Sequence, residues 1–292
     1  MKVITSVVNN PDFIEMQYWT LKEHFKGEYE YIVFNDAKDF PDFTNGGDVG
    51  MRKEIENVCK SLNIKCINVK NNHHKRLDMS NRHADTFNNN VLKYQKENPD
   101  KYLLLDSDMF LIDDIGEDKY SNYDVGIVLQ MRKNQGYIWP GLCYFDMNKM
   151  KNFELINWSL LPGFDSGGMT KEWLKKQMAG KELPDMLEME KNRSSEEKYH
   201  VNDIYFIKYL RGGTWTIEDL PKKIKENREL IKYLTEDSRN KDGKMFCEIY
   251  ENAILHYRSG GNWRKEGMEF HKGLTKKLKE ILLKNTSMEK KQ

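Results

Sequence analysis

The chain has 292 residues, and its charges nearly cancel, with 47 lysines and arginines against 46 aspartates and glutamates. This length accommodates one large domain with a sizeable core. The balanced charge gives no indication of a nucleic acid or an anionic membrane as a partner. Aromatic residues make up 12% of the chain, a content typical of a packed, folded protein.

The cysteines and the N-terminus bear on the compartment. Cys59, Cys66, Cys143 and Cys247 form no close pair, which favours free thiols in a reducing environment. The first ten residues, MKVITSVVNN, are too short for a secretory signal and are typical of a first strand. No segment approaches the ~18 apolar residues of a membrane span. We therefore expect a soluble, cytoplasmic protein.

Strand-like and helix-like segments alternate in the first part of the chain. The pattern predicts strands over 3–8, 29–35, 65–69 and 102–105, and helices over 11–25, 52–62 and 80–94, the last with Ser80 as its N-cap. Such alternation is typical of βαβ units in a parallel sheet, whose ligands bind beyond the carboxyl ends of the strands. We predict a single α/β, Rossmann-like domain over 1–285, with a central, mostly parallel mixed sheet flanked by helices, and a tail over 286–292.

The second half of the chain is less regular. We expect strands over 123–129 and 141–146, a Gly-rich loop over 160–170, an exposed and partly helical segment over 171–195, a helix beginning near Val201, a solvated charged segment over 222–242 and a basic helix from about Glu266. No composition change marks a linker, so these segments are assigned to the same domain.

Two aspartates interrupt the apolar stretch KYLLLDSDMFLIDD at 101–114. Because an unpaired buried carboxylate costs several kcal/mol, Asp106 and Asp108 are expected to be paired, to lie in a cleft or to bind a cation. Two carboxylates at this spacing supply hard oxygen ligands for Mn²⁺ or Mg²⁺. The alternative is a turn in which both aspartates accept hydrogen bonds from nearby amides.

A histidine with similar potential lies far down the chain. In AILHYRSGGNW, His256 ends an apolar strand and precedes Gly260 and Gly261. An imidazole there can complete a metal shell, with the glycine backbone and Arg258 near a diphosphate. The alternative is a histidine that only supports the fold.

Four segments, in their order along the chain, resemble the glycosyltransferases of the GT-A fold, in particular the glycogenin-like and bacterial galactosyltransferase-like families. The resemblance lies in Asp106-Ser107-Asp108 after YLLL, GLCYFDMNKM at 141–150, VNDIYFIKYL at 201–210 and LHYRSGGNW at 255–263. It implies a nucleotide-binding half over 1–120 and an acceptor-binding half over 121–285. It also implies a metal-dependent enzyme that moves a sugar from a nucleotide sugar, by default a UDP-sugar, to a glycan or protein acceptor.

The resemblance also implies roles for particular residues. Mn²⁺ or Mg²⁺ would be held by Asp106, Asp108 and His256. The nucleotide sugar would contact Val8, Asn9, Asn35 and Asp36 with its base and ribose, Arg82 with its phosphate or sugar, and Ser107, Arg258 and Gly260 near the diphosphate. The alternatives are a strand-ending turn for Asn35 and Asp36 and a surface ion pair for Arg82.

On the acceptor side, Asp203 is the candidate catalytic carboxylate, either as general base or as a positioning group. Asp165, in GFDSGG, is the competing candidate. Trp139, Trp158 and Trp173 are either faces on which a sugar can stack or buried packing residues.

Two other function classes remain open at this stage. Phosphohydrolases of the haloacid dehalogenase type also carry Asp-x-Asp after a strand, but a Thr or Val follows their second aspartate by two positions, where this chain has Phe110. A non-catalytic nucleotide-sugar or glycan-binding relative is the other alternative, against which the intact Asp106, Asp108 and His256 speak. The oligomeric state is left open.

Overall fold

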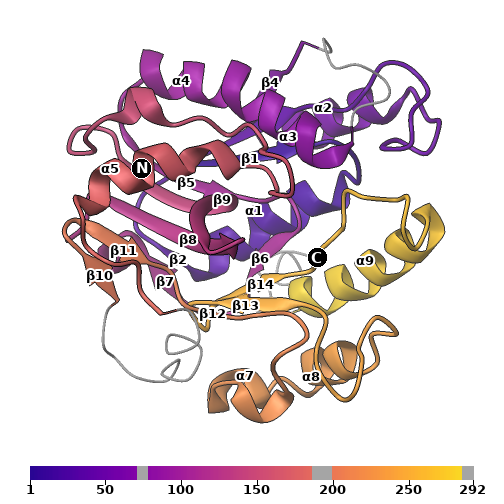
Figure 1. Ribbon diagram of the computed structural model, residues 1–292. Coiled ribbons are helices and arrows are strands. Elements are labelled where there is room, and N and C mark those ends of the chain that lie inside the picture. The colour runs from indigo at the N-terminus through magenta and orange to yellow at the C-terminus, as the bar shows by residue number, and fades with distance from the viewer. Residues whose placement is uncertain (71–77, 186–198, 285–292) are drawn as a thin grey trace.

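The structure, a computed structural model, describes residues 1–70, 78–185 and 199–284. Its main feature is a mixed eight-stranded sheet, in the spatial order β10-β11-β8-β9-β5-β1-β3-β4. These strands are β1 (Lys2–Val7), β3 (Glu30–Asn35), β4 (Lys65–Asn68), β5 (Lys101–Leu105), β8 (Val125–Arg132), β9 (Gln135–Asp146), β10 (His200–Val201) and β11 (Ile204–Phe206). The predicted α/β class, with a mixed central sheet flanked by helices, is confirmed (Figure 1).

Strand direction decides which residues share an edge of this sheet. β1 pairs in parallel with β3 and β5, and β3 with β4. β9 is antiparallel to both β5 and β8, and β11 is parallel to β8. Therefore β8 and β11 run in the same direction as β5, and their carboxyl ends lie at the same edge.

Helices cover both faces of the large sheet. They are α1 (Asp12–His24), α2 (Met51–Ser61), α3 (Met79–Thr86), the π-helical η1 (Phe87–Val91), α4 (Leu92–Glu97) and α5 (Lys171–Met178). Successive strand residues point to opposite faces, so Val3 packs in one core with Ile14 of α1, and Ile4 packs in the other core with Phe87 of η1. Each face of the sheet thus has its own apolar layer.

A smaller antiparallel sheet, in the order β12-β13-β14-β6, lies beside the large one. Its strands are β6 (Met109–Leu111), β12 (Tyr209–Leu210), β13 (Glu248–Tyr250) and β14 (Ile254–His256). The helices α7 (Lys222–Lys225), α8 (Arg228–Thr235) and α9 (Met268–Leu283) lie on its side of the molecule, orange and yellow in Figure 1. A third core joins Phe13 of α1 to Leu234 of α8 and Leu278 of α9.

The remaining elements are short. β2 (Phe25–Lys26) pairs in parallel with β7 (Ile115–Gly116). Single 3-10 turns occur at η2 (Glu117–Lys119), η3 (Phe153–Leu155), η4 (Gly168–Thr170) and η5 (Ile217–Asp219). The four cysteines are free thiols, as predicted. In the part of the chain that the structure describes, no helix has the length and apolar character needed to cross a bilayer.

Two local predictions are wrong. The helix expected near Val201 is instead β10 and β11, because Asn202 turns the chain with a φ of 53° and Ile204 pairs with Val125 of β8. The segment 222–242 is not a solvated excursion. It contains α7 and α8, and Leu230 and Leu234, spaced four residues apart on one face of α8, are buried in the third core.

Two other predictions need adjustment. Ser80 lies inside α3, and the N-cap is Asp78, whose Oδ1 accepts a hydrogen bond of 2.8 Å from the amide of Asn81. In the segment predicted to be exposed and partly helical, α5 covers Lys171–Met178 with Trp173 and Leu174 buried, and 186–195 lie outside the described residues. The expected tail, 286–292, also lies outside them.

Candidate functional site

The connection between the two sheets carries the two aspartates. β5 ends at Leu105 in the large sheet and β6 begins at Met109 in the small one, so Asp106 and Asp108 lie at the crossing. β6 is antiparallel to β14, with Met109 opposite His256, and the amide of Tyr257 donates to the carbonyl of Asp108 at 2.9 Å. Backbone pairing thus places His256 beside the aspartates.

The three predicted metal ligands form one group. Asp106, Asp108 and His256 each offer a ligand atom, and these atoms all lie within 4.8 Å of one another. His256 Nε2 is 3.2 Å from Asp108 Oδ1, and Asp108 and His256 are 4% and 6% exposed. Two carboxylates and an imidazole held this closely are a donor set that fits Mn²⁺ or Mg²⁺.

Glycine is required next to this group. The amide of Gly260 donates to Asp108 Oδ2 at 2.8 Å. A Cβ at Gly260 would lie 2.9 Å from the Cβ of Asp108 and 2.6 Å from the Cζ of Phe13, closer than real Cβ atoms approach. The contact explains why a glycine is needed at this position.

Charges within the group are strongly coupled. Burial raises the pKa of Asp106, and the negative charge of Asp108 raises it further. Burial also opposes ionisation of Asp108, but the charge and hydrogen bond of His256 and the amide of Gly260 outweigh it, so the pKa of Asp108 lies below its usual range. Burial lowers the pKa of His256, but Asp108 and Glu248 together raise it to about 10. A protonated imidazole therefore balances the carboxylates, and a bound cation would displace that proton.

The group opens into a cavity of about 460 Å³ at the carboxyl edge of the large sheet. Its volume lies within the range of roughly 300–1,000 Å³ common for small-molecule sites. The wall comes from several elements: Ser6 and Val8 at the end of β1, Met79, Ser80 and His83 of α3, Gln130 and Arg132 of β8, Trp139 of β9, Asp165 and Ser166, Glu248 of β13, and Arg258 to Asn262 with Lys265.

Four predicted nucleotide contacts line this cavity: Val8, Ser107, Arg258 and Gly260. Asn9 lies just behind the wall, 1% exposed. Its Nδ2 donates to the carbonyls of Thr44 and Gly261, at 2.5 and 3.1 Å. Asn9 therefore holds two loops together beside the cavity.

The other predicted nucleotide contacts do not reach the cavity. Asn35, Asp36 and Arg82 are all fully buried. Asn35 Nδ2 donates to the side chain of Asn68 at 3.1 Å, and Asp36 pairs with Lys38 at 2.8 Å.

Arg82 makes two parallel hydrogen bonds to the Asp42 carboxylate, at 2.8 and 2.6 Å. Such a bidentate pair occupies both the guanidinium and the carboxylate. The ion pair considered for Arg82 exists, but it is buried instead of on the surface, and it ties α3 to the loop around Asp42.

Of the three candidate tryptophans, one lines the cavity and two are buried in the core. Trp158 and Trp173 are 0% and 1% exposed, and both belong to the apolar core between the sheet and α5, so packing explains them. Trp139 lines the cavity, with its ring 5.2 Å from that of His256 and stacked on Tyr250 at 5.9 Å.

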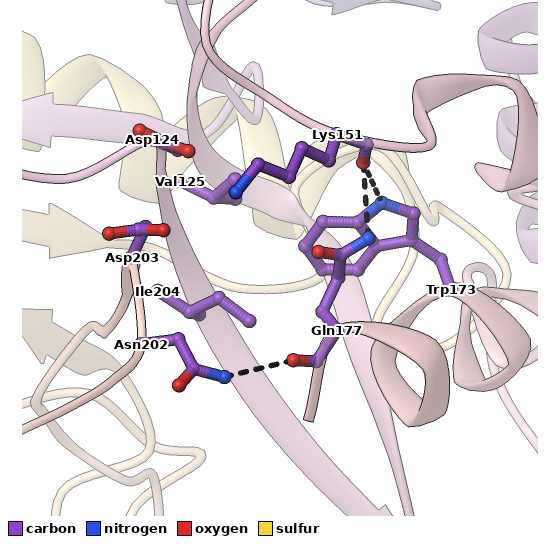
Figure 2. Close-up of a pocket in the computed structure, with 8 residues that line it drawn as sticks. All are labelled: Asp124, Val125, Lys151, Trp173, Gln177, Asn202, Asp203 and Ile204. Carbon is purple, nitrogen blue, oxygen red and sulfur yellow. Dashed lines mark hydrogen bonds between the residues drawn. The ribbon is translucent and has the colours of Figure 1, made fainter. Parts of the chain in front are cut away.

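Asp203 is not brought to the metal-ligand group. It directly precedes β11, which runs in the same direction as β5, so Asp203 lies at the amino edge of the sheet and Asp106 at the carboxyl edge. There it lines a separate cavity of about 360 Å³ with Asp124, Lys151 and Gln177 (Figure 2). The competing candidate, Asp165, does line the cavity of the metal-ligand group.

Several residues of the cavity wall were not predicted: His83, Gln130, Arg132, Glu248 and Lys265. For Glu248 the sequence did contain a signal, because in MFCEIY it interrupts an apolar strand just as Asp106 and Asp108 do. The others carry no comparable signal, since charged and polar residues at strand and helix ends are common.

Fold and site together define an α/β protein with a candidate metal centre at the carboxyl edge of its main sheet. No protein-family model matches the chain, and no curated protein matches it in sequence. The functional assignment therefore depends on the chemistry of the cavity.

Proposed function

We propose that this chain is a metal-dependent glycosyltransferase of the GT-A type, which transfers a sugar from a nucleotide sugar, by default a UDP-sugar, to a glycan or protein acceptor. The observation that carries the proposal is the convergence of Asp106, Asp108 and His256 in a cavity of about 460 Å³ beyond the carboxyl end of β1. Ligands of sheets with parallel strands bind at this edge.

The barrier in glycosyl transfer is departure of a diphosphate from the anomeric carbon. A divalent cation bound by Asp106, Asp108 and His256 would neutralise the charge that develops on that leaving group. Arg258 and Lys265 line the same cavity and would add positive charge to the site of a bound diphosphate. The side chains of Ser6 and Val8, at the end of β1, offer a surface to the nucleoside.

For the acceptor hydroxyl we assign Asp165 in place of Asp203, because Asp165 shares the cavity with the metal-ligand group. Its Oδ1 accepts a hydrogen bond of 2.8 Å from the amide of Ser166, which fixes one oxygen. An aspartate carboxylate is a weak base toward a sugar hydroxyl. It suffices because the hydroxyl becomes acidic as it attacks a carbon with cationic character.

The proposal is tested with a panel of nucleotide sugars, with and without Mn²⁺. We expect one of them to raise the melting temperature, because a ligand at 100 times its Kd adds about 2.7 kcal/mol of stability. The rise should occur only when Mn²⁺ is present, because the proposed site binds the diphosphate through the cation. Turnover of that nucleotide sugar should fall by about 10³-fold in Asp108→Asn, since a catalytic cation contributes several kcal/mol. Asp124→Asn, at the opposite edge of the sheet, serves as the matched control and should keep both properties.

Two results would redirect the assignment. Release of phosphate from simple phosphomonoesters, without a sugar nucleotide, would make the chain a phosphohydrolase. Mn²⁺-dependent nucleotide-sugar binding without turnover in the presence of a wide set of acceptors would make it a binding protein.

A further inference from the structure

His256 is held on both sides of its ring. Nε2 faces Asp108, and Nδ1 is 3.0 Å from Oε2 of Glu248. Glu248 lies directly opposite His256 in the β13–β14 pair, so the sheet itself sets the contact between the two side chains. The imidazole therefore has a carboxylate at each nitrogen, one from the candidate metal-ligand group and one from the neighbouring strand.

Glu248 is itself firmly positioned. Its Oε2 accepts a hydrogen bond of 2.7 Å from the hydroxyl of Tyr250, and its Oε1 accepts one of 3.3 Å from the amide of Gly212. Arg258 Nε is 3.7 Å from the same Oε1. Because Glu248 is only 9% exposed and its carboxylate is held by these contacts, the carboxylate has little freedom to turn away from His256.

The contact determines which imidazole nitrogen can bind a metal. A neutral imidazole carries its proton on one nitrogen and a lone pair on the other. Because an ionised carboxylate can only accept, Glu248 keeps the proton on Nδ1 and leaves the lone pair of Nε2 directed toward Asp108. Histidines that bind metals commonly donate their other N–H to a carboxylate in this way.

We propose that Glu248 is a positioning residue of the metal centre, which fixes the ring orientation and tautomer in which His256 binds a divalent cation through Nε2. This inference rests on the proposed function, because it requires that Asp106, Asp108 and His256 hold a cation. In this role Glu248 needs no contact of its own with the donor sugar or the acceptor. It acts through His256.

The chain offers a closely matched control. Glu251, just after β13, is also a carboxylate that accepts from a tyrosine hydroxyl, Tyr205, and from a backbone amide, that of Lys208, at 2.9 and 3.0 Å. Its side chain is 4% exposed, and it pairs with Lys119 at 2.7 Å. Glu251 does not line the cavity. Glu251→Gln therefore reproduces the loss of a buried carboxylate without touching His256.

The experiment titrates Mn²⁺ alone into the full chain by calorimetry at a single pH. Glu248→Gln should weaken Mn²⁺ binding by about 10–100-fold, the usual cost of losing the outer partner of a metal-bound histidine. Glu248→Leu, which removes the acceptor altogether, should weaken it at least as much. Glu248→Asp keeps a carboxylate and should recover part of the affinity. Glu251→Gln should bind as the wild type does, and melting curves in EDTA identify any variant that fails to fold.

A second readout separates positioning from general support of the fold. In Glu248→Gln, turnover should need a higher Mn²⁺ concentration for half-maximal rate, and saturating Mn²⁺ should restore kcat to near the wild-type value. A residue that only supported the fold would lower the melting temperature and leave the Mn²⁺ dependence unchanged, which would overturn the proposal.

The outcomes also separate the two proposals. If wild-type protein binds Mn²⁺, Asp108→Asn does not, and Glu248→Gln binds as tightly as the wild type, then the role of Glu248 is overturned and the metal centre stands. If the wild-type protein binds no Mn²⁺, the proposed function is overturned and the role of Glu248 with it.

Discussion

The two edges of the large sheet each carry a pair of aspartates, and the pairs differ in kind. At the carboxyl edge, Asp106 and Asp108 are joined by His256 in a largely buried group. At the amino edge, Asp124 and Asp203 line a cavity with Lys151, and Asp203 is exposed (Figure 2). Two carboxylates become a candidate cation site where they are largely buried and a third ligand lies beside them.

The pKa shifts of the aspartates also differ between the two edges of the sheet. Burial raises the pKa of Asp124 and the charge of Asp203 raises it further, while Lys149 and Lys151 partly compensate. At the carboxyl edge, the charge of His256 instead holds the pKa of Asp108 below its usual range. Two lysines partly offset the charge of one pair, and the imidazole of His256, on the strand beside β6, neutralises the other.

Among the carboxylates at the two edges, Asp165, on the wall of the carboxyl-edge cavity, should give the greatest loss of activity on substitution. Asp165→Asn should reduce sugar transfer by about 10²–10⁴-fold, the range for loss of a general acid or base. Mn²⁺ affinity should stay unchanged, because Asp165 is not one of the three metal ligands. Donor binding should persist as well, because the role assigned to Asp165 is toward the acceptor hydroxyl. Single-turnover rates and calorimetric donor binding measure the two properties. Full transfer activity in this variant would remove Asp165 from the mechanism.

An intermediate effect is expected in the pH dependence of stability. The measurement uses protein kept metal-free with EDTA. Burial opposes ionisation of Glu248, but hydrogen bonding and the charge of His256 lower the pKa of Glu248 from 4.5 to about 2. The folded-state pKa lies below the unfolded one, so this stabilisation is present above pH 4.5 and is lost as the pH falls toward 2. The pKa of His256 is raised from 6.5 to about 10, so its stabilisation is present below pH 6.5 and is lost as the pH rises through 10.

Urea unfolding across this pH range should show both losses in the wild type, on the order of a few kcal/mol at each end. In Glu248→Gln, the free energy of unfolding should fall less between pH 4.5 and pH 2 than it does in the wild type. Asp124→Asn should act with the opposite sign, because the pKa of Asp124 is raised and its charged form is disfavoured in the fold. It should stabilise by no more than about 0.5 kcal/mol at neutral pH, with no gain in acid. If the unfolding free energies of the wild type and Glu248→Gln fell equally as the pH is lowered, the stabilising contact between Glu248 and His256 would be contradicted.

The smallest effect is expected at the amino edge. Asp203→Asn should change the Kd for Mn²⁺ and the transfer rate by no more than about twofold, because an exposed carboxylate contributes little outside a site. Calorimetry and steady-state kinetics measure both quantities. A large loss of transfer in this variant would return Asp203 to the role first considered for it and would break the distinction between the two edges.

Local patterns were sufficient for much of the fold. Short apolar runs predicted β1, β3 and β5, and helical spacing predicted α1 and α2, because these elements are decided by side chains close in sequence. The same reasoning failed at Val201, where pairing of Ile204 with Val125 overrides helical spacing. It also failed for α8, whose apolar face is meaningful only once α9 and the small sheet are in place.

The local sequence marks Asp106, Asp108 and His256 as unusual, because each is a polar residue that interrupts or ends an apolar stretch. The tertiary structure brings them together, through the register of β6 against β14. It also decided that Glu248 joins them, that Asp165 shares their cavity, and that Asp203 and Arg82 lie elsewhere. The physical reason is that strand direction and register are set by contacts between segments far apart in the chain, which a local pattern does not contain.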